Sequence, residues 1–190
     1  PILLRMLEES PRLELLARIH AALTRLNIHT KQYARATTHA RQSSELCEQL
    51  DEPLIELSAR NMYAIALQES DDHDQARQQL KRCYALAQTL GSARFQVIAL
   101  NTLGDLEMRL GRWHEAQHWL RLGLDVGRQR YPLAAYLHGN LAWAALHEER
   151  ADTALVHIDE ALSRLADEPS IVRAFLLEIK HYALAMQNKP

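Results

Sequence analysis

Small residues recur along this chain at intervals of about 40 positions, and few folds accommodate that spacing. The first such column is formed by four alanines, Ala36, Ala76, Ala116 and Ala154. Twelve positions before each alanine stands a second column of small residues, Thr24, Ala64, Gly104 and Ala142. Self-similarity at a fixed interval is typical of repeat proteins, in which each copy is one supersecondary unit. The two columns therefore predict four copies of the same unit.

The third copy indicates what that unit is. Residues 100–123 contain a helical stripe of leucines, then Gly111, then a second helical stripe that begins at Trp113. Glycine readily takes the left-handed conformation that ends a helix, so Gly111 marks a turn between two helices. This pattern resembles the tetratricopeptide repeat (TPR), in which small residues let two antiparallel helices pack closely and large residues fill the space between them.

Composition agrees with a helical chain. Hydrophobic residues make up 47% of the sequence, which is enough for a core, whereas Gly and Pro number only six each. Long β-branched runs are absent, which disfavours strands. Four prolines stand where the first helix of a pair is expected to begin, namely Pro11, Pro53, Pro132 and Pro169. We therefore expect no proline inside a helix, where it would cost about 3 kcal/mol.

We expect an all-α, TPR-like α-solenoid, a right-handed superhelix of antiparallel helix pairs. Residues 1–190 are expected to form a single array, with residues 1–9 as the tail of a preceding helix. The predicted repeats are residues 11–50, 53–91, 93–130 and 132–167, followed by a last helix at 170–187. Because the chain starts at Pro1 and ends part-way through a repeat, we expect it to be a fragment of a larger protein.

Net charge and hydropathy limit the classes of partner that the chain is expected to bind. The net charge of −2 argues against direct contact with nucleic acid, which usually requires a basic face. No apolar run approaches the roughly 20 residues that cross a bilayer, so no membrane segment is expected. Cys47 and Cys83 are the only cysteines in the sequence, and we interpret both as buried thiols of a cytoplasmic protein.

The TPR resemblance implies that the first helix of each pair lines a concave binding surface. The residues expected there are Arg25, Asn61, Asn101, Asp105, Tyr136, Asn140 and Trp143, with Arg18 and Met108 nearby. A row of asparagines can pair with a peptide backbone, and the two aromatic residues offer apolar area with polar tips. A purely structural interpretation stays open, because asparagine is common in such hairpins and the tryptophan also suits a core.

One motif points to different chemistry. His114-Glu115-Ala116-Gln117-His118 matches H-E-x-x-H, in which two histidines bind zinc and the glutamate acts as general base. Here Ala116 belongs to the small-residue column, and each histidine lies about 200° around the helix from it. Both histidines are therefore expected to face solvent, and no third ligand is evident. A zinc-dependent hydrolase is a remote alternative, His114 and His118 are weak metal candidates, and no cofactor is expected.

The repeat interval exceeds the 34 residues of most TPR sequences. Long second helices that end in phrases such as ALAQTLG, residues 85–91, are similar to the TPR regions of large bacterial signalling ATPases, including the MalT-like transcription regulators. That resemblance implies a region that senses an inducer or a partner protein, while separate ATPase and DNA-binding modules do the rest. The motifs of those two modules are absent from this sequence.

We therefore predict a non-catalytic module that recognises a protein, a peptide or a small-molecule inducer within a larger signalling or transcription regulator. Two alternatives stay open. One is a general protein–protein adaptor or assembly scaffold, and the other is a peptide-pheromone-type receptor, which the asparagine row suggests. A homodimer formed through an uncapped terminal helix is a further prediction.

Overall fold

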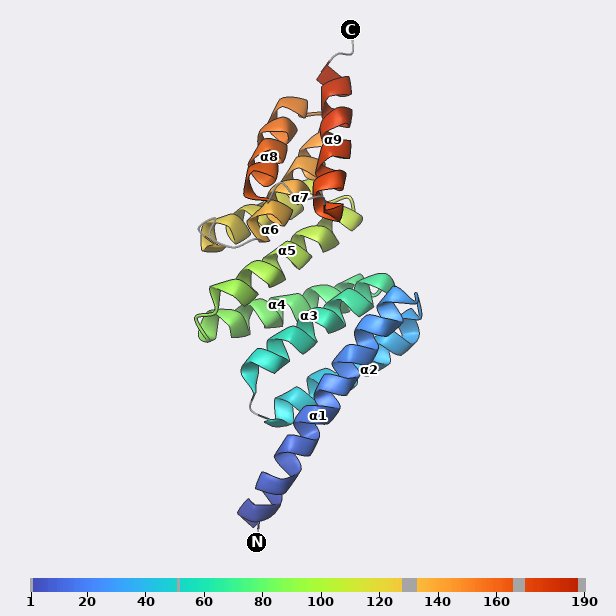
Figure 1. Ribbon diagram of the computed structural model, residues 1–190, viewed down its shortest axis with the longest axis vertical. Coiled ribbons are helices and arrows are strands. Elements are labelled where there is room, and N and C mark those ends of the chain that lie inside the picture. Colours follow the sequence, from blue (N-terminus) through green and yellow to red (C-terminus); the bar gives the residue numbers. More distant parts are fainter. Residues whose placement is uncertain (1, 51, 128–132, 166–169, 188–190) are drawn as a thin grey trace. The chain divides into compact units, whose positions relative to one another are not determined.

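The computed structural model describes residues 2–50, 52–127, 133–165 and 170–187, and every regular element among them is an α-helix (Figure 1). Nine helices follow one another in this part of the chain: α1 (Ile2–His29), α2 (Tyr33–Leu50), α3 (Pro53–Glu69), α4 (His73–Thr89), α5 (Ala93–Arg109), α6 (Trp113–Gly127), α7 (Leu133–His147), α8 (Ala151–Arg164) and α9 (Ile171–Gln187). The predicted all-α class is confirmed. The chain forms two compact units, residues 1–95 and 96–190.

The turn between the two helices of a pair has the same form in all four copies. The second residue after the first helix of the pair has a left-handed φ of 56° to 70° in each case, at Lys31, Asp71, Gly111 and Glu149. The backbone N–H that follows donates to a carbonyl five residues earlier, as from Arg112 to Glu107 at 2.8 Å. This is the bonding of a Schellman motif, which satisfies carbonyls left open at a helix end. Only the third copy carries glycine there, so the sequence predicted this turn clearly in one copy.

In the first unit, successive helices from α1 to α4 pack against each other, and α1 also contacts α3 (Figure 1). The first helices of neighbouring pairs are thereby adjacent. The core between them consists largely of small residues, with Leu57 and Leu80 as fully buried larger side chains. Cys47 and Cys83 are buried in this core as free thiols, as predicted.

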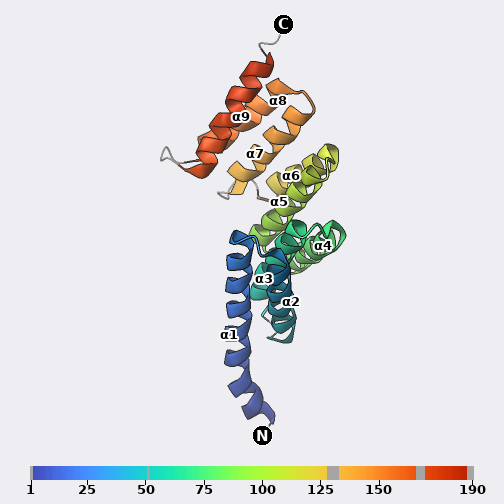
Figure 2. The same cartoon turned by 90° about the vertical axis from the view of Figure 1, so that its right-hand side faces the viewer.

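The second unit repeats the arrangement. Helices α6 to α9 pack in succession, and α7 also contacts α9, again placing two first helices side by side (Figure 2). Leu120 of α6 packs with Val97, Leu137 and Leu141 in one cluster. A second cluster joins α7, α8 and α9 around Ile158. Ser170 caps α9 by accepting a hydrogen bond from the backbone N–H of Arg173.

The two columns of small residues lie inside these cores. Each alanine of the first column is fully buried, at 0% exposure. The residues of the second column are buried as well, and Gly104 shows why they are small. A Cβ at Gly104 would stand 2.6 Å from both Cγ and Cδ2 of Leu120, which is closer than any non-bonded carbon pair allows. Two paired helices can approach this closely only where the residue of one helix at the crossing point is small.

One predicted boundary is wrong. Helix α1 runs without a break from Ile2 through Pro11 to His29, so residues 1–9 are not the tail of a separate helix. Proline has a φ close to that of a helix and removes only one backbone donor, and here the helix continues through it. Pro53 does begin α3 as expected. The expected starts at Pro132 and Pro169 lie outside the described residues. No helix in the described ranges is both long enough and apolar enough to cross a membrane.

The contact at Gly104 yields a stability prediction. We expect Gly104→Ala to lower the free energy of unfolding by about 1–3 kcal/mol, because the fully buried Leu120 has to move. Urea unfolding followed by circular dichroism measures the change. Gly139→Ala is the control, since its Cβ would meet a single Leu176 methyl at 3.2 Å. An equal effect of the two substitutions would show that the crossing at Gly104 is not specifically tight.

Candidate functional site

An apolar pocket of the second unit lies between the first helices α7 and α9. It is a pocket of about 250 Å³ lined by Trp143, Leu146, His147, Phe175, Glu178, Ile179 and Tyr182. Phe175, Glu178 and Tyr182 are spaced three and four residues apart, so they lie on one face of α9. Ile179 belongs to the buried core and closes the floor. Two aromatic side chains remain accessible here, with Phe175 43% and Tyr182 56% exposed.

Aromatic stacking holds the wall on the α7 side. The ring of His147 stacks on Trp113 with centroids 3.9 Å apart and an interplanar angle of 6°. Trp143 meets the same imidazole edge-on at 5.0 Å and lies 6.2 Å from Phe175. Trp143 also packs against the buried cluster that α7, α8 and α9 form. Trp143 therefore both packs against the core and lines the pocket.

The first unit has a hollow of different character between its own first helices, α1 and α3. Its volume is about 420 Å³, and its lining consists of Arg18, Ala21, Arg25, Ser43, Leu54, Ile55, Ser58 and Ala59. Arg18 forms an exposed ion pair with Glu14 at 2.6 Å. Arg25 is exposed, and no described carboxylate pairs with it. This groove is basic, whereas the pocket between α7 and α9 is aromatic and carries one carboxylate.

The remaining predicted residues are less accessible. Asn140 donates from Nδ2 to Oδ1 of Asn101 at 3.1 Å, so these two amides join α7 to α5. Asn61 is half-buried on α3 in the first unit. Asp105 accepts a hydrogen bond from Nε of Arg109 at 3.2 Å. One donor of Asn140 and the side-chain acceptor of Asn101 are thus engaged in a hydrogen bond within the fold.

Two further placements bear on the predicted surface. Tyr136 is 46% exposed on α7. Met108 is only 7% exposed and packs with Ala116 and Ala144, so it belongs to the core and was wrongly placed near the binding surface. A methionine can serve either environment, and its spacing in the sequence does not distinguish them.

The H-E-x-x-H histidines face solvent, as the helical register predicted. His114 and His118 are both exposed on α6. They border a shallow hollow of about 230 Å³ together with Arg121, Leu122 and Asp125. Within the described ranges, no group of three or more His, Cys, Asp and Glu side chains is arranged to hold a metal ion. A cation placed between these two histidines would therefore lack a third protein ligand from this part of the chain.

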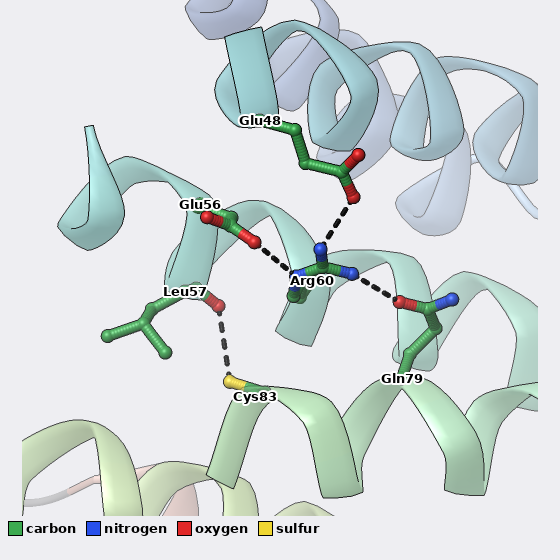
Figure 3. Close-up of polar contacts among 6 residues, drawn as sticks. All are labelled: Glu48, Glu56, Leu57, Arg60, Gln79 and Cys83. Carbon is green, nitrogen blue, oxygen red and sulfur yellow. Dashed lines mark hydrogen bonds and ion pairs between the residues drawn. The ribbon is translucent and has the colours of Figure 1, made fainter. Parts of the chain in front are cut away.

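A buried arginine ties three helices of the first unit together (Figure 3). Arg60 of α3 donates to Glu56 at 2.6 Å, to Glu48 of α2 at 2.5 Å and to Gln79 of α4 at 3.0 Å. Its side chain is 11% exposed, so these partners offset most of the cost of burying the charge. Beside it, Cys83 donates to the carbonyl of Leu57 at 3.4 Å, and burial raises the pKa of its thiol to about 12.

The Arg60–Gln79 contact occupies a register position that recurs. Arg60 stands four residues before its small-column residue, and Gln79 three residues after its buried alanine. In the first and fourth copies the same two positions are held by histidines, His20 with His39 and His138 with His157. The two Nδ1 atoms lie 3.0 Å apart in the first pair and 3.1 Å apart in the second. Within each pair, one imidazole therefore donates an N–H hydrogen bond to the other. Sequence analysis missed these pairs, although each histidine pair is separated by 19 residues in a matching register.

The fourth-copy pair is the more buried of the two. Burial, with smaller contributions from His157 and the Arg164 guanidinium, lowers the pKa of His138 to about 4. Burial likewise lowers the pKa of His157, and the nearby arginines Arg121 and Arg150 add to the effect. If both rings were protonated, two N–H donors would face each other. Nε2 of His138 is buried and has no hydrogen-bond partner among the described residues, which adds to the cost of charging this ring.

Known families and curated proteins offer no sequence match: no family model matches the chain, and no curated protein does. Solved structures do match. BtubC (BKLC) from P. vanneervenii superposes with a TM-score of 0.74 at 16% identity, covering 96% of this chain and 82% of that one. A protein of Podosopora anserina assigned as a kinesin light chain, with nearly identical TPR-like repeats, gives 0.72 at 14% identity over 90% and 86% of the two chains.

The apo form of RapI is a third similar structure, with a TM-score of 0.71 at 13% identity over 90% of this chain and 69% of RapI. Identities this low establish the fold alone. Together with the recurring turn and the buried small columns, these likenesses define the chain as a TPR-like helical-repeat protein. Repeats of this kind generally bind proteins or peptides.

The arginine network leads to a second prediction. We expect Arg60→Ala to reduce the free energy of unfolding by about 3 kcal/mol, because Glu56 and Gln79 lose a buried partner. Arg41→Ala is the matched control, since its ion pair with Glu45 is more than half exposed at both ends. Urea unfolding should show a change below about 1 kcal/mol for this control. Equal losses in both variants would contradict the structural role of Arg60.

The histidine pair predicts a dependence of stability on pH. His138 has a folded pKa of about 4 against an ordinary value of 6.5, so the unfolded chain binds more protons between these two values. The free energy of unfolding should therefore be highest above pH 6.5 and decrease as the pH drops towards 4. Between pH 7 and pH 5 we expect a decrease of about 2 kcal/mol. Unfolding curves at both pH values measure this loss. His138→Gln should flatten the dependence, whereas His181→Gln, which changes an exposed histidine, should leave it unaltered.

Proposed function

We propose that this chain is a non-catalytic binding module that recognises a segment of a protein or peptide partner. The observation that carries the proposal is that each unit has an accessible hollow between neighbouring first helices. Arg25 lines the groove between α1 and α3, and Trp143 lines the pocket between α7 and α9. Both residues were expected at a binding surface from sequence alone.

The chemistry of the two grooves supports recognition. One groove offers guanidinium groups, which pair with carboxylates, and the other offers aromatic surface in a concave pocket, which is typical of an anchor site. Exposed aromatic side chains such as Phe175 and Tyr182 are costly to leave in water unless a partner covers them. Surface of this kind binds a side chain of a partner without any bond being made or broken.

The wider setting that we propose is a single array of such repeats within a cytoplasmic signalling or transcription regulator, whose ATPase and DNA-binding modules would reside elsewhere. The 40-residue interval and the long second helices support this setting through their resemblance to the MalT-like regulators. A general assembly adaptor is the second candidate. The grooves suit a regulator and an adaptor equally well, so the two candidates must be separated by the rest of the gene product. Flanking nucleotide-binding and DNA-binding segments in the full-length gene product would favour the regulator.

A selection from a phage-displayed peptide library, followed by calorimetry with the selected peptides, tests groove binding. We expect Tyr182→Ala and Trp143→Ala, or Arg25→Ala for peptides seated on α1 and α3, to weaken binding by about 10-fold or more. Tyr182 is the sharper probe because its exposed ring contributes little to the core.

Val156→Ala is the control, because it removes an exposed apolar side chain from the second helix α8. Circular dichroism verifies that each variant retains its helices. Peptides that bind all four variants as tightly as the unaltered chain would show that the partner uses another surface, and the proposal would then be wrong.

A further inference from the structure

We propose that the pocket between α7 and α9 takes a cationic side chain, a lysine or an arginine, from the partner segment. This inference rests on the proposed binding function and adds the chemical class of the anchor residue. Three features of the pocket carry it: the arrangement of its aromatic rings, its carboxylate, and the absence of lysine and arginine from the described residues that line it.

The rings form two sides of the pocket. The ring centroids of Trp143 and Phe175 stand 6.2 Å apart with the planes tilted by 49°, so the rings do not stack flat on each other. Tyr182 follows Phe175 by seven residues on the same face of α9. The faces of aromatic rings carry negative electrostatic potential and attract a cation placed within about 6 Å. A ligand between these rings would therefore meet favourable potential from more than one side.

The position of the charge agrees with this arrangement. Glu178 lies between Phe175 and Tyr182 on that face of α9 and is exposed. None of the ion pairs of the described residues includes Glu178, and the neighbouring Lys180 is already paired with Asp159 at 2.7 Å. A carboxylate at the rim of an aromatic pocket favours a cation and repels an anionic side chain.

The groove between α1 and α3 provides a contrast within the same chain. Arg18 and Arg25 line it, and no aromatic residue does. A cationic side chain is disfavoured there by like charge, although both grooves lie between neighbouring first helices. Cation binding is therefore a property of the residues on α7 and α9, not of the repeat fold in general.

The test compares probes of equal shape and different charge on the whole chain. The probes are N-acetyl-trimethyllysine methylamide, its uncharged carbon isostere, N-acetyl-lysine methylamide and N-acetyl-glutamate methylamide. Indole N–H signals in ¹H–¹⁵N spectra report binding, and the Trp143→Phe spectrum identifies the signal of Trp143. We expect the trimethyllysine probe to shift that signal and to bind about 5-fold to 30-fold more tightly than the isostere, with no shift from the glutamate probe.

Two variants locate the effect. Glu178→Gln should weaken the trimethyllysine probe several-fold and leave the isostere unchanged, and Phe175→Leu should weaken the cationic probe while keeping an apolar wall. Glu115→Gln is the control, since it removes an exposed carboxylate of α6 outside the pocket. Apart from the assignment of the Trp143 signal, the comparison of probes on the unaltered chain does not depend on whether any variant folds.

The outcomes separate this inference from the proposed function. If the isostere shifts the Trp143 signal as strongly as the cation does, the pocket is an apolar anchor site, so the inference fails and the binding function stands. If no probe shifts that signal, the inference is overturned, and the peptide selection then decides the function by itself. If the glutamate probe binds best, the pocket has the opposite preference and the inference is equally wrong.

Discussion

Close approach of paired helices is the constraint on which the rest of this structure depends. Leu120 fits against the backbone at Gly104, at a distance that a single added carbon would make impossible. Equivalent crossings in the other copies are occupied by Thr24, Ala64 and Ala142, all buried. Because the crossings are tight, the larger side chains between helix pairs fill the core, and the first helices of neighbouring pairs come together. The grooves are consequences of that packing.

Polar contacts between the two helices of a pair also help to specify how the helices pack. The position four residues before the crossing faces the position three residues after the buried alanine on the other helix of the pair. In three of the four copies these positions form a hydrogen-bonded bridge, once through Arg60 and Gln79 and twice through two histidines. In the third copy they hold Leu100 and Trp119. A polar bridge in a mostly apolar interface fixes the register of two helices, because any other register leaves buried donors or acceptors without partners.

Function, as proposed, arises where this regular packing presents different side chains at equivalent places. The groove of the first unit carries two arginines, and the pocket of the second unit carries three aromatic rings and a carboxylate. Both sites lie between neighbouring first helices of the same repeat fold, so the side chains, not the fold, set the chemistry of recognition. This is the usual division in helical-repeat proteins, where neighbouring copies supply stability and surface residues supply specificity.

The sequence by itself determined the helical hairpin, its copies and their inward faces, because small residues at a fixed interval and the 3.6-residue period of apolar positions are local features of the chain. It also placed Trp143 and Arg25 on accessible faces and turned His114 and His118 towards solvent. Tertiary structure alone decided that Met108 is core, that Asn101 and Asn140 bond to each other, and that Arg60 and the histidine pairs bridge helices. It also decided that Phe175, Glu178 and Tyr182 face Trp143. Each of these depends on which side chain of another helix lies opposite, and that choice is made only when the helices pack.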